Sequence, residues 1–441
     1  MRLVKKAIFW LHLGAGLLAG LVVLILGVTG VIMSFERQIL EANHGVTVSQ
    51  PTGQASIAGP EKILAAHADA MPAASGVTYY SDPEMPASVQ FGRGKSTYAD
   101  PYTGESLGEG NTALKGFFGW ALRLHRWLTL EGAAREVGGE VVKIGNMVFL
   151  FLVVSGLYLW FPKRWTRSGL LAITTLKFRL KGRARDWNWH NAFGFWACIP
   201  LLFIVLTGVV MSYAWANNLI YKAVGEAPPP PRQAGGRPAS PAMGAEGRPR
   251  QAGERSGPRA DGGQRPERQM VREGGERGAE RPARDSGGRQ GGGREREEHS
   301  HVHGPVTLAG LDAGLAMVKA ASPGWRTIVV ATPKGTTAQY TVSASHRGRP
   351  DLRRTLTVDL ATGQVVKNEG FESQTTGRKA RTFARWIHTG EAFGWPGQAV
   401  MGLASLAAVV LVWTGFALSW RRFFKKRRLT VSMPAALKEA A

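Results

Sequence analysis

The sequence predicts an α-helical membrane protein in which four transmembrane helices form a parallel duplicated two-helix unit, with two small α+β domains outside the membrane. Four apolar runs within 441 residues are each long enough to cross a hydrocarbon core of about 30 Å, which needs about 20 residues. Short motifs of the first half recur in the same order in the second half. Basic residues cluster beside alternate ends of the runs, as expected for membrane spans.

The apolar runs divide the chain into spans and connecting segments. The predicted spans are residues 7–35, 139–162, 187–215 and 397–420. The first connecting region holds an α+β domain at 36–116 and an amphipathic interfacial helix at 117–131; the second holds an α+β domain at 305–370 and an interfacial segment at 380–395. Residues 163–186 form a basic loop, 228–304 an insertion rich in Gly, Pro, Arg and Glu, and 421–441 a basic tail. Because the insertion has almost no large apolar residues, it is expected to be disordered.

The basic residues behind the net charge of +23 are placed so that they indicate the orientation of the spans in the membrane. Basic residues precede the first span, fill the loop between the second and third spans, and follow the fourth. All three clusters fall on one side if the spans alternate, which places both termini in the cytoplasm. The first run is expected to remain as an anchor, because its apolar core far exceeds the roughly 7 to 15 residues of a signal peptide. The charge gives no support to a nucleic-acid partner.

The two connecting regions share a pattern of helical and strand-like pieces. The first has a helical piece at 60–70 and a strand-like piece at 88–91. The second has a helical piece at 308–320 and strand-like pieces at 325–331, 338–343 and 355–359. Each region closes on a turn motif, DPYTG at 100–104 and DLATG at 359–363, which is typical of two short strands joined by a tight turn.

Further motifs recur between the halves. TGVIMSF at 29–35 of the first half corresponds to TGVVMSY at 207–213 of the second. In the same way WALRLH at 120–125 corresponds to FARWIH at 383–388, and SGL at 155–157 corresponds to TGF at 414–416. Because both halves enter the membrane from the cytoplasm, the repeats are parallel and are expected to be related by an axis along the membrane normal. The insertion belongs to the second half only.

Two histidines in the first and third spans form the first candidate site, here called the inner pair: His12 and His190. An ionisable residue inside a membrane helix is costly and is a functional candidate by default. Glycines four and eighteen positions after each histidine fall on its own helix face. These glycines are Gly16 and Gly30 in the first span and Gly194 and Gly208 in the third. The pattern predicts a flat ligand between the helices, which we interpret as haem b with the two histidines as axial ligands. The alternative is a pair of interfacial histidines beside glycines that permit close helix packing.

Two further histidines occupy matched positions at the outer face, and we call them the outer pair: His125 and His388. They are the candidate ligands of a second haem, with Gly30 and Gly208 clearing space at the same level. Nearby arginines are candidate partners for its propionates, because charge-assisted hydrogen bonds favour that pairing. These arginines are Arg123, Arg126 and Arg385. The alternative is two surface helices whose aromatic residues form an interfacial belt. One haem and two haems both remain open.

These motifs resemble those of the PepSY-associated transmembrane helix family, which includes inner-membrane iron-uptake proteins and ferric-siderophore reductases. The resemblance rests on WNWHN with its downstream TG, the two DxxTG turns and the two outer histidine segments. It covers nearly the whole chain except 228–304 and the last dozen residues. The resemblance implies bundled helices, two periplasmic PepSY domains, the bacterial inner membrane and, in the reductase branch, b-type haem bound by histidine pairs.

The expected function is transmembrane electron transfer. An electron would enter from a cytoplasmic donor, pass the inner haem and then the outer haem, and reach a periplasmic acceptor. The resemblance implies a ferric chelate such as a ferric siderophore as that acceptor. No flavin or nicotinamide fingerprint is present, so the donor is a separate cytoplasmic reductase or a membrane quinol. The residues that would contact the acceptor cannot be named from the sequence.

Other functions remain open. If the histidines are structural and the spans only anchor the chain, the protein is a non-enzymatic membrane protein with a periplasmic binding or regulatory role. A third alternative is a transport accessory in iron uptake. The single cysteine, Cys198, allows no intramolecular disulfide, and there is no C-x-x-C-H for covalent haem attachment. The motif HSHVH makes His299, His301 and His303 weak candidates for a metal ion. The lipid bilayer is an expected partner, and a homodimer is compatible with the sequence.

Overall fold

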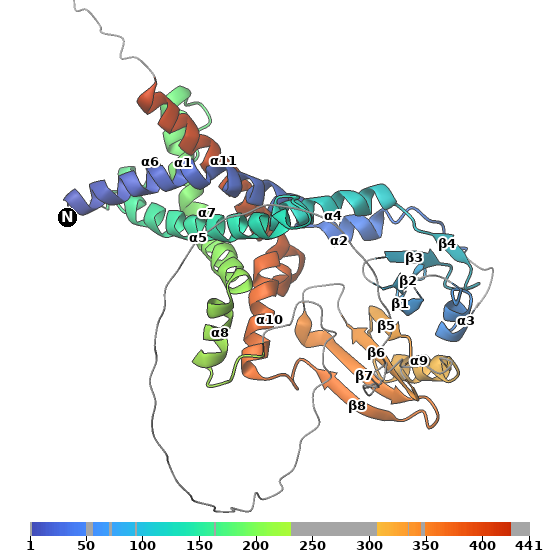
Figure 1. Cartoon of the computed structure of the whole chain (residues 1–441). Helices are drawn as coiled ribbons and strands as arrows, with labels where there is room; N and C mark the ends of the chain where they lie inside the picture. Colours follow the sequence, from blue (N-terminus) through green and yellow to red (C-terminus); the bar gives the residue numbers. More distant parts are fainter. Residues whose placement is uncertain are drawn as a thin grey trace, which may run out of the picture. The chain divides into compact units, whose positions relative to one another are not determined.

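The fold is taken from a computed structural model that describes residues 2–49, 56–69, 73–92, 95–162, 165–230, 307–333, 335–344 and 349–424. Figure 1 follows these residues along the chain. Most of the predicted insertion at 228–304 and of the tail at 421–441 lies outside them. The weak metal candidates His299, His301 and His303 lie outside them as well.

Within the described residues, four helices are long and apolar enough to cross a membrane. They are α1 (Arg2–Met33), α5 (Ala134–Trp160), α7 (Gly182–Ser212) and α11 (Gly394–Phe423). The four predicted spans are therefore confirmed, and the protein is a multi-pass helical membrane protein. All four helices begin before the predicted spans, and the added first turns of α1, α5 and α7 contain charged residues.

The long helices pack in an antiparallel ring. Helix α1 contacts α5 and α11, and α7 contacts the same two helices. Small residues permit this packing: Ala197 of α7 lies in an apolar cluster with Ala404 and Ala408 of α11. The Asn146 side chain of α5 donates to the Val205 carbonyl of α7 over 3.2 Å.

The strands of both halves form one antiparallel sheet. In the first half they are β1 (Ala74–Tyr80), β2 (Ala87–Phe91), β3 (Lys95–Ala99) and β4 (Ser106–Gly108). In the second half they are β5 (Thr327–Ala331), β6 (Thr337–Ser343), β7 (Arg353–Asp359) and β8 (Val365–Gly370). Their order in the sheet is β4-β3-β2-β1-β5-β6-β7-β8. The sequence predicts two small separate α+β domains, but β1 and β5 pair along their edges and merge them. An unpaired strand edge favours such pairing.

The junction of the two halves is symmetric. Thr78 of β1 lies opposite Val329 of β5, and Val77 and Tyr79 lie opposite Val330 and Ile328. Helices α3 (Pro60–Ala65) and α9 (Leu311–Ala320) contact each other beside this junction. A single buried core joins the two helices to strands of both halves. The two predicted helical pieces are therefore present, both shorter than expected.

Helices α3 and α9 cap each other through carboxylates. The backbone N–H of Glu61 donates to Asp312 over 2.9 Å, and the backbone N–H of Asp312 donates to Glu61 over 3.2 Å. A carboxylate near a helix N-terminus accepts hydrogen bonds from N–H groups that lack an intrahelical partner. This reciprocal cap ties the two halves together a second time.

Both predicted turns are present. The Asp100 carboxylate accepts backbone N–H groups of Tyr102 and Thr103 over 2.8 and 3.0 Å, and Gly104 has a φ of 78°. Asp359 accepts the N–H groups of Ala361 and Thr362 over 3.0 and 2.9 Å. An aspartate side chain that bonds the backbone two or three residues on stabilises a tight turn, and glycine tolerates the positive φ that follows.

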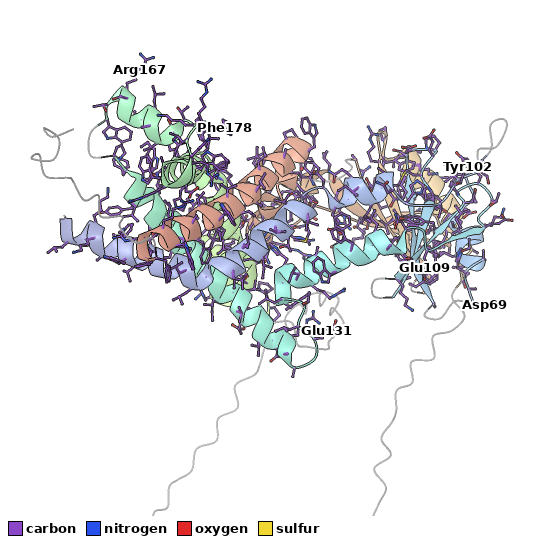
Figure 2. The ribbon with its side chains drawn as sticks, turned by 90° about the horizontal axis from the view of Figure 1, so that it is seen from above. Asp69, Tyr102, Glu109, Glu131, Arg167 and Phe178 are labelled. Carbon is purple, nitrogen blue, oxygen red and sulfur yellow. The ribbon has the colours of Figure 1, made fainter. Side chains whose placement is uncertain are left out.

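Shorter helices lie between the long helices and the sheet or, in the case of α6, between α5 and α7. They are α2 (Glu36–Ala42), α4 (Thr112–Trp127), α6 (Arg167–Thr174), α8 (Ala214–Ala223) and α10 (Thr376–Thr389). The predicted interfacial segments at 117–131 and 380–395 correspond to α4 and α10, with shifted ends. Helix α10 stops at Gly390, whose φ is 75°. Helix α6 lies inside the predicted basic loop, and Figure 2 labels Arg167 at its start and Phe178 just beyond its end.

Candidate functional site

The inner pair lies in a cavity within the helix bundle. His12 of α1 and His190 of α7 both line this cavity, which has a volume of about 420 Å³. All four long helices contribute to its wall, and most of the lining side chains are apolar. The volume falls within the range of about 300–1,000 Å³ that ligand pockets occupy.

His12 is held by a hydroxyl of the neighbouring helix. Its Nδ1 lies 2.8 Å from the Ser155 Oγ of α5. That hydroxyl donates its own proton to the Phe151 carbonyl over 2.6 Å. Because the serine proton is already used, the His12 Nδ1–H donates and the serine oxygen accepts, which is an assignment from the hydrogen-bond network. The Nε2 of His12 then carries a free lone pair, as a metal-binding imidazole requires.

His190 repeats this arrangement in the second half. Its Nδ1 lies 2.9 Å from the Thr414 Oγ1 of α11, which donates to the Val410 carbonyl over 2.7 Å. The same reasoning assigns the proton of His190 to Nδ1 and leaves its Nε2 as an acceptor. The hydrogen bonds to the hydroxyls fix the orientation of both rings, as second-shell partners do for metal-binding histidines.

Glycines leave room for both rings. A Cβ added to Gly156 would lie 3.3 Å from the His12 Cε1, and one added to Gly415 would lie 3.6 Å from the His190 Cε1. The predicted glycines Gly16 and Gly194 both line the cavity. A Cβ on either would meet only a leucine methyl group, at 3.8 and 3.6 Å respectively. Five glycines line the cavity, and the sequence reasoning gave a site role to two of them, Gly16 and Gly194, and to none of Gly20, Gly156 and Gly415.

The outer pair is brought together by α4 and α10. The rings of His125 and His388 have centroids 6.5 Å apart and planes inclined by 71°. Two imidazoles bound in line to one metal, each at about 2.0 Å from nitrogen to metal, have centroids roughly 6 Å apart. The observed separation therefore fits two ligands of one iron.

The outer histidines also donate Nδ1–H to groups of the long helices. The Nδ1 of His125 lies 2.7 Å from the Thr29 Oγ1, and that hydroxyl donates to the Ile25 carbonyl over 2.6 Å. The Nδ1 of His388 lies 2.8 Å from the Ile204 carbonyl and 3.2 Å from the Thr207 Oγ1. The hydroxyl of Thr207 donates to the Phe203 carbonyl over 2.5 Å.

Burial keeps the outer pair neutral. Burial, with smaller contributions from the neighbouring His388 and Arg126, lowers the pKa of His125 to about 3. Burial also lowers the pKa of His388. A neutral imidazole with its proton on Nδ1 is the form that binds a metal through Nε2.

Gly30 and Gly208 were expected to clear space beside the outer pair. In the structure they lie instead where two long helices touch. A Cβ on Gly30 would lie 2.9 Å from the Ser405 Oγ of α11. A Cβ on Gly208 would lie 2.9 Å from the Asn146 Nδ2 of α5. These glycines allow the long helices to approach closely. For Gly30 and Gly208 the structure therefore agrees with the alternative interpretation, in which the glycines permit close helix packing.

The candidate propionate partners lie at the outer helices. The guanidinium of Arg126 stacks on the Trp127 ring at 4.5 Å from its centroid. Arg123 and Arg385 have exposed side chains. Within the described residues none of the three arginines forms an ion pair, so each remains available to an anionic group.

The hydroxyl partners of the histidines were missed by the sequence reasoning. They are Thr29, Ser155, Thr207 and Thr414. Each hydroxyl residue directly precedes a glycine, and each long helix contains one such pair. The signal was therefore present in the recurring TG and SG motifs, of which the sequence reasoning assigned a role only to Gly30 and Gly208.

The comparison with protein families gives one match. The sequence model of the family described as PepSY-associated TM region matches residues 9–422. That range includes all four histidines of the two pairs and their hydroxyl partners. No curated protein matches the chain.

Proposed function

Because the chain belongs to the family of the PepSY-associated TM region, we propose that it is a haem-containing reductase of the bacterial inner membrane. It would pass electrons from a cytoplasmic or quinol donor across the membrane to a periplasmic acceptor. One observation carries the proposal: four histidines in two pairs each donate Nδ1–H to the long helices and keep Nε2 free. Haem b, when bound, supplies one-electron chemistry.

The proposal gives the side chains distinct roles. His12 and His190 would hold one haem within the bundle, and His125 and His388 would hold a second haem at the outer helices. Ser155 and Thr414 keep the proton of the inner rings on Nδ1, and Gly156 and Gly415 leave space for those rings. The apolar cavity wall excludes water from the inner ligands, which favours neutral imidazoles.

We also propose that the two halves are a duplicated unit with PepSY-like domains. The symmetric register of β1 with β5 supports this, as does the reciprocal cap between Glu61 and Asp312. Matched contacts support it too, because the His12–Ser155 bond of the first half recurs as His190–Thr414 in the second. The basic residues near the ends of α7 and α11 favour cytoplasmic termini.

The acceptor that we propose is a ferric chelate such as a ferric siderophore. The resemblance to the iron-uptake members of the family supports this choice, and a sheet domain beyond the membrane offers a surface for a bulky chelate. Electron transfer to such an acceptor needs a donor on the other side, so the full reaction requires a separate reductase or a membrane quinol.

The visible spectrum of the purified protein tests the haem proposal. The expected result is a low-spin b-type spectrum with two haems per chain, which falls to one in His190→Ala and in His388→Ala. The matched control is His44→Ala, which removes a histidine outside the long helices and should leave the spectrum unchanged. Colourless protein from haem-replete cells would contradict the proposal and favour a binding or transport role.

Reconstituted vesicles test the reductase activity. With a reductant enclosed and a ferric chelate outside, the protein should speed formation of the ferrous complex, and His190→Ala should abolish that gain. Equal rates in protein-free vesicles would exclude ferric chelates as acceptors while leaving the haem proposal intact.

A further inference from the structure

Four arginines gather at the basic end of the bundle, where α7 begins and α11 ends. They are Arg183, Arg185, Arg421 and Arg422. The buried Asp186 carboxylate pairs with two of them, Arg185 over 2.8 Å and Arg421 over 3.1 Å. The Asp186 side chain has no exposed surface, so this charge is committed to its two partners.

The other two arginines line the cavity of the inner pair. Arg183 and Arg422 both contribute to its wall, and neither forms an ion pair with any residue that the structure describes. The Arg422 guanidinium lies over the rings of Phe9 and Trp10, at 5.0 and 4.9 Å from their centroids. These aromatic contacts hold the cation at the cavity without neutralising it.

Two aromatic rings lie beside these arginines in the cavity wall. Trp160 and Phe195 both line the cavity, and their rings stack with centroids 4.6 Å apart. They contribute apolar surface to the wall.

Arg183 lies on the same helix as His190 and precedes it by seven residues, roughly 10 Å along a helix. The position equivalent to Arg183 in the first half is Lys5, seven residues before His12, and its Nζ donates to the Phe161 carbonyl over 3.3 Å. Lys5 does not line the cavity, so the arginine and lysine charges at the described part of its wall come from the second half.

We propose that Arg183 and Arg422 bind the two carboxylates of the haem held by the inner pair. The carboxylates then point toward the basic end, and the second half fixes their direction. This inference rests on the proposed haem function and adds the residues that orient the group. Guanidinium groups suit this role because they form charge-assisted, bidentate hydrogen bonds with carboxylates.

The test compares haem b with its dimethyl ester, which lacks the negative charges. Both are titrated into full-length protein purified from haem-deficient cells, and binding is followed by the low-spin spectrum. At the inner site, isolated by His388→Ala in every protein compared, haem b should bind more tightly than the ester, and Arg183→Gln with Arg422→Gln should weaken haem b by about 10- to 100-fold and abolish the preference. The low-spin spectrum should persist in the variant, because the histidines remain, and the midpoint potential of the inner haem should fall.

The matched control is Arg179→Gln, an exposed arginine of the same loop that does not line the cavity. Equal preference for haem b in the double variant and the wild type would overturn the proposal. An effect seen only in phosphatidylglycerol nanodiscs, and absent in phosphatidylcholine nanodiscs, would also overturn it and assign the arginines to lipid phosphate. Wild-type protein that binds neither haem would instead refute the proposed function.

Discussion

The inner and outer histidine pairs use the same hydrogen bond in different surroundings. In the inner pair each ring lies on one long helix and donates to a hydroxyl of the next helix. In the outer pair each ring lies on a short helix, α4 or α10, and donates to a long helix. The inner rings border a cavity, whereas the outer rings lie 6.5 Å apart between centroids.

This difference shows that the group that orients a histidine ring is distinct from the space that would accept a ligand beside it. The Ser or Thr hydroxyl is common to both pairs, so it sets the protonation of the ring wherever the ring lies. The space beside the ring depends instead on the helices around it. The inner pair is built into the bundle and needs glycines, whereas the outer pair depends on how α4 and α10 are placed by their neighbouring segments.

Filling the inner cavity should give the largest difference between the inner and outer pairs in haem binding. In Gly16→Phe with Gly194→Phe, two aromatic rings would occupy the cavity wall where a Cβ now meets only a leucine methyl group. The inner haem should be lost completely while the outer haem stays, as measured by the haem-to-protein ratio. Gly116→Phe is the control, because a Cβ there meets no atom within 4 Å. Retention of both haems would show that this cavity is not the inner haem site.

Removing the inner hydroxyls should have the next largest effect. Ser155→Ala and Thr414→Val each leave a histidine Nδ1–H without its acceptor. Loss of such a partner costs about 10- to 100-fold in metal affinity, and the weaker ligand should also shift the midpoint potential of the inner haem. Haem titration and potentiometry measure both quantities. Ser405→Ala, which contacts no histidine, should change neither.

The outer hydroxyls should differ from each other. His125 donates to Thr29, whereas His388 has the Ile204 carbonyl as well as Thr207. Thr29→Val should therefore weaken the outer haem more than Thr207→Val does, by about tenfold against a few-fold. Equal losses in the two variants would show that the carbonyl of Ile204 is not an effective second acceptor.

The glycines beside the inner rings should give a smaller difference. Gly156→Ala would place a Cβ 3.3 Å from His12, closer than ordinary contact, while Gly415→Ala would place one 3.6 Å from His190. We expect Gly156→Ala to cost about 1 kcal/mol of binding free energy, which is roughly fivefold in affinity, and Gly415→Ala to cost less. A reversed order would mean that the His12 ring moves aside more easily than the His190 ring.

The smallest expected effect is that of low pH on the two Asp turns, and the two turns should respond unequally. Burial acts to raise the pKa of Asp100, but backbone N–H groups of Ser49, Thr103 and Tyr102 outweigh it and hold the pKa below 3.8. A carboxyl with a lowered folded-state pKa stabilises the fold above its unfolded value, and this stability is lost as the pH falls through the folded value. Asp100→Asn should therefore cost about 1 kcal/mol at neutral pH and almost nothing at pH 2, as measured by denaturant unfolding.

Asp359, which is less buried than Asp100, is the natural comparison for that experiment. The backbone N–H of Thr362 lowers its pKa, which gives the same sign of pH dependence. Its exposure reduces the effect, so Asp359→Asn should change stability less than Asp100→Asn does. A larger change at Asp359 would indicate that β8 depends on its turn more than the buried first turn suggests.

Local patterns in the sequence predicted the parts of this protein that depend on local chemistry. Apolar length predicted the four spans, and the matched glycine pattern after His12 and His190 paired two histidines that line one cavity. The Asp-x-x-Thr-Gly turns were also predictable, because their hydrogen bonds join residues only two or three apart.

Contacts between distant segments were not predictable in the same way. The pairing of β1 with β5 joins residues about 250 positions apart, and nothing in either strand specifies the other as its neighbour. The partner of His12 is Ser155, whose hydroxyl could equally have satisfied only its own helix. Gly30 and Gly208 share the face of their histidines, yet which neighbouring helix meets that face is decided by packing.

The antiparallel pairing of β1 with β5 has the form of a contact between two identical subunits. A local two-fold axis passes between Thr78 and Val329, and the exchange of caps between Glu61 and Asp312 obeys the same axis. Such an isologous contact is how a homodimer of half-length chains would close the same sheet. A break in the backbone between α8 and α9 should therefore leave two fragments that, when produced in the same cell, reassemble through this seam into a complete bundle.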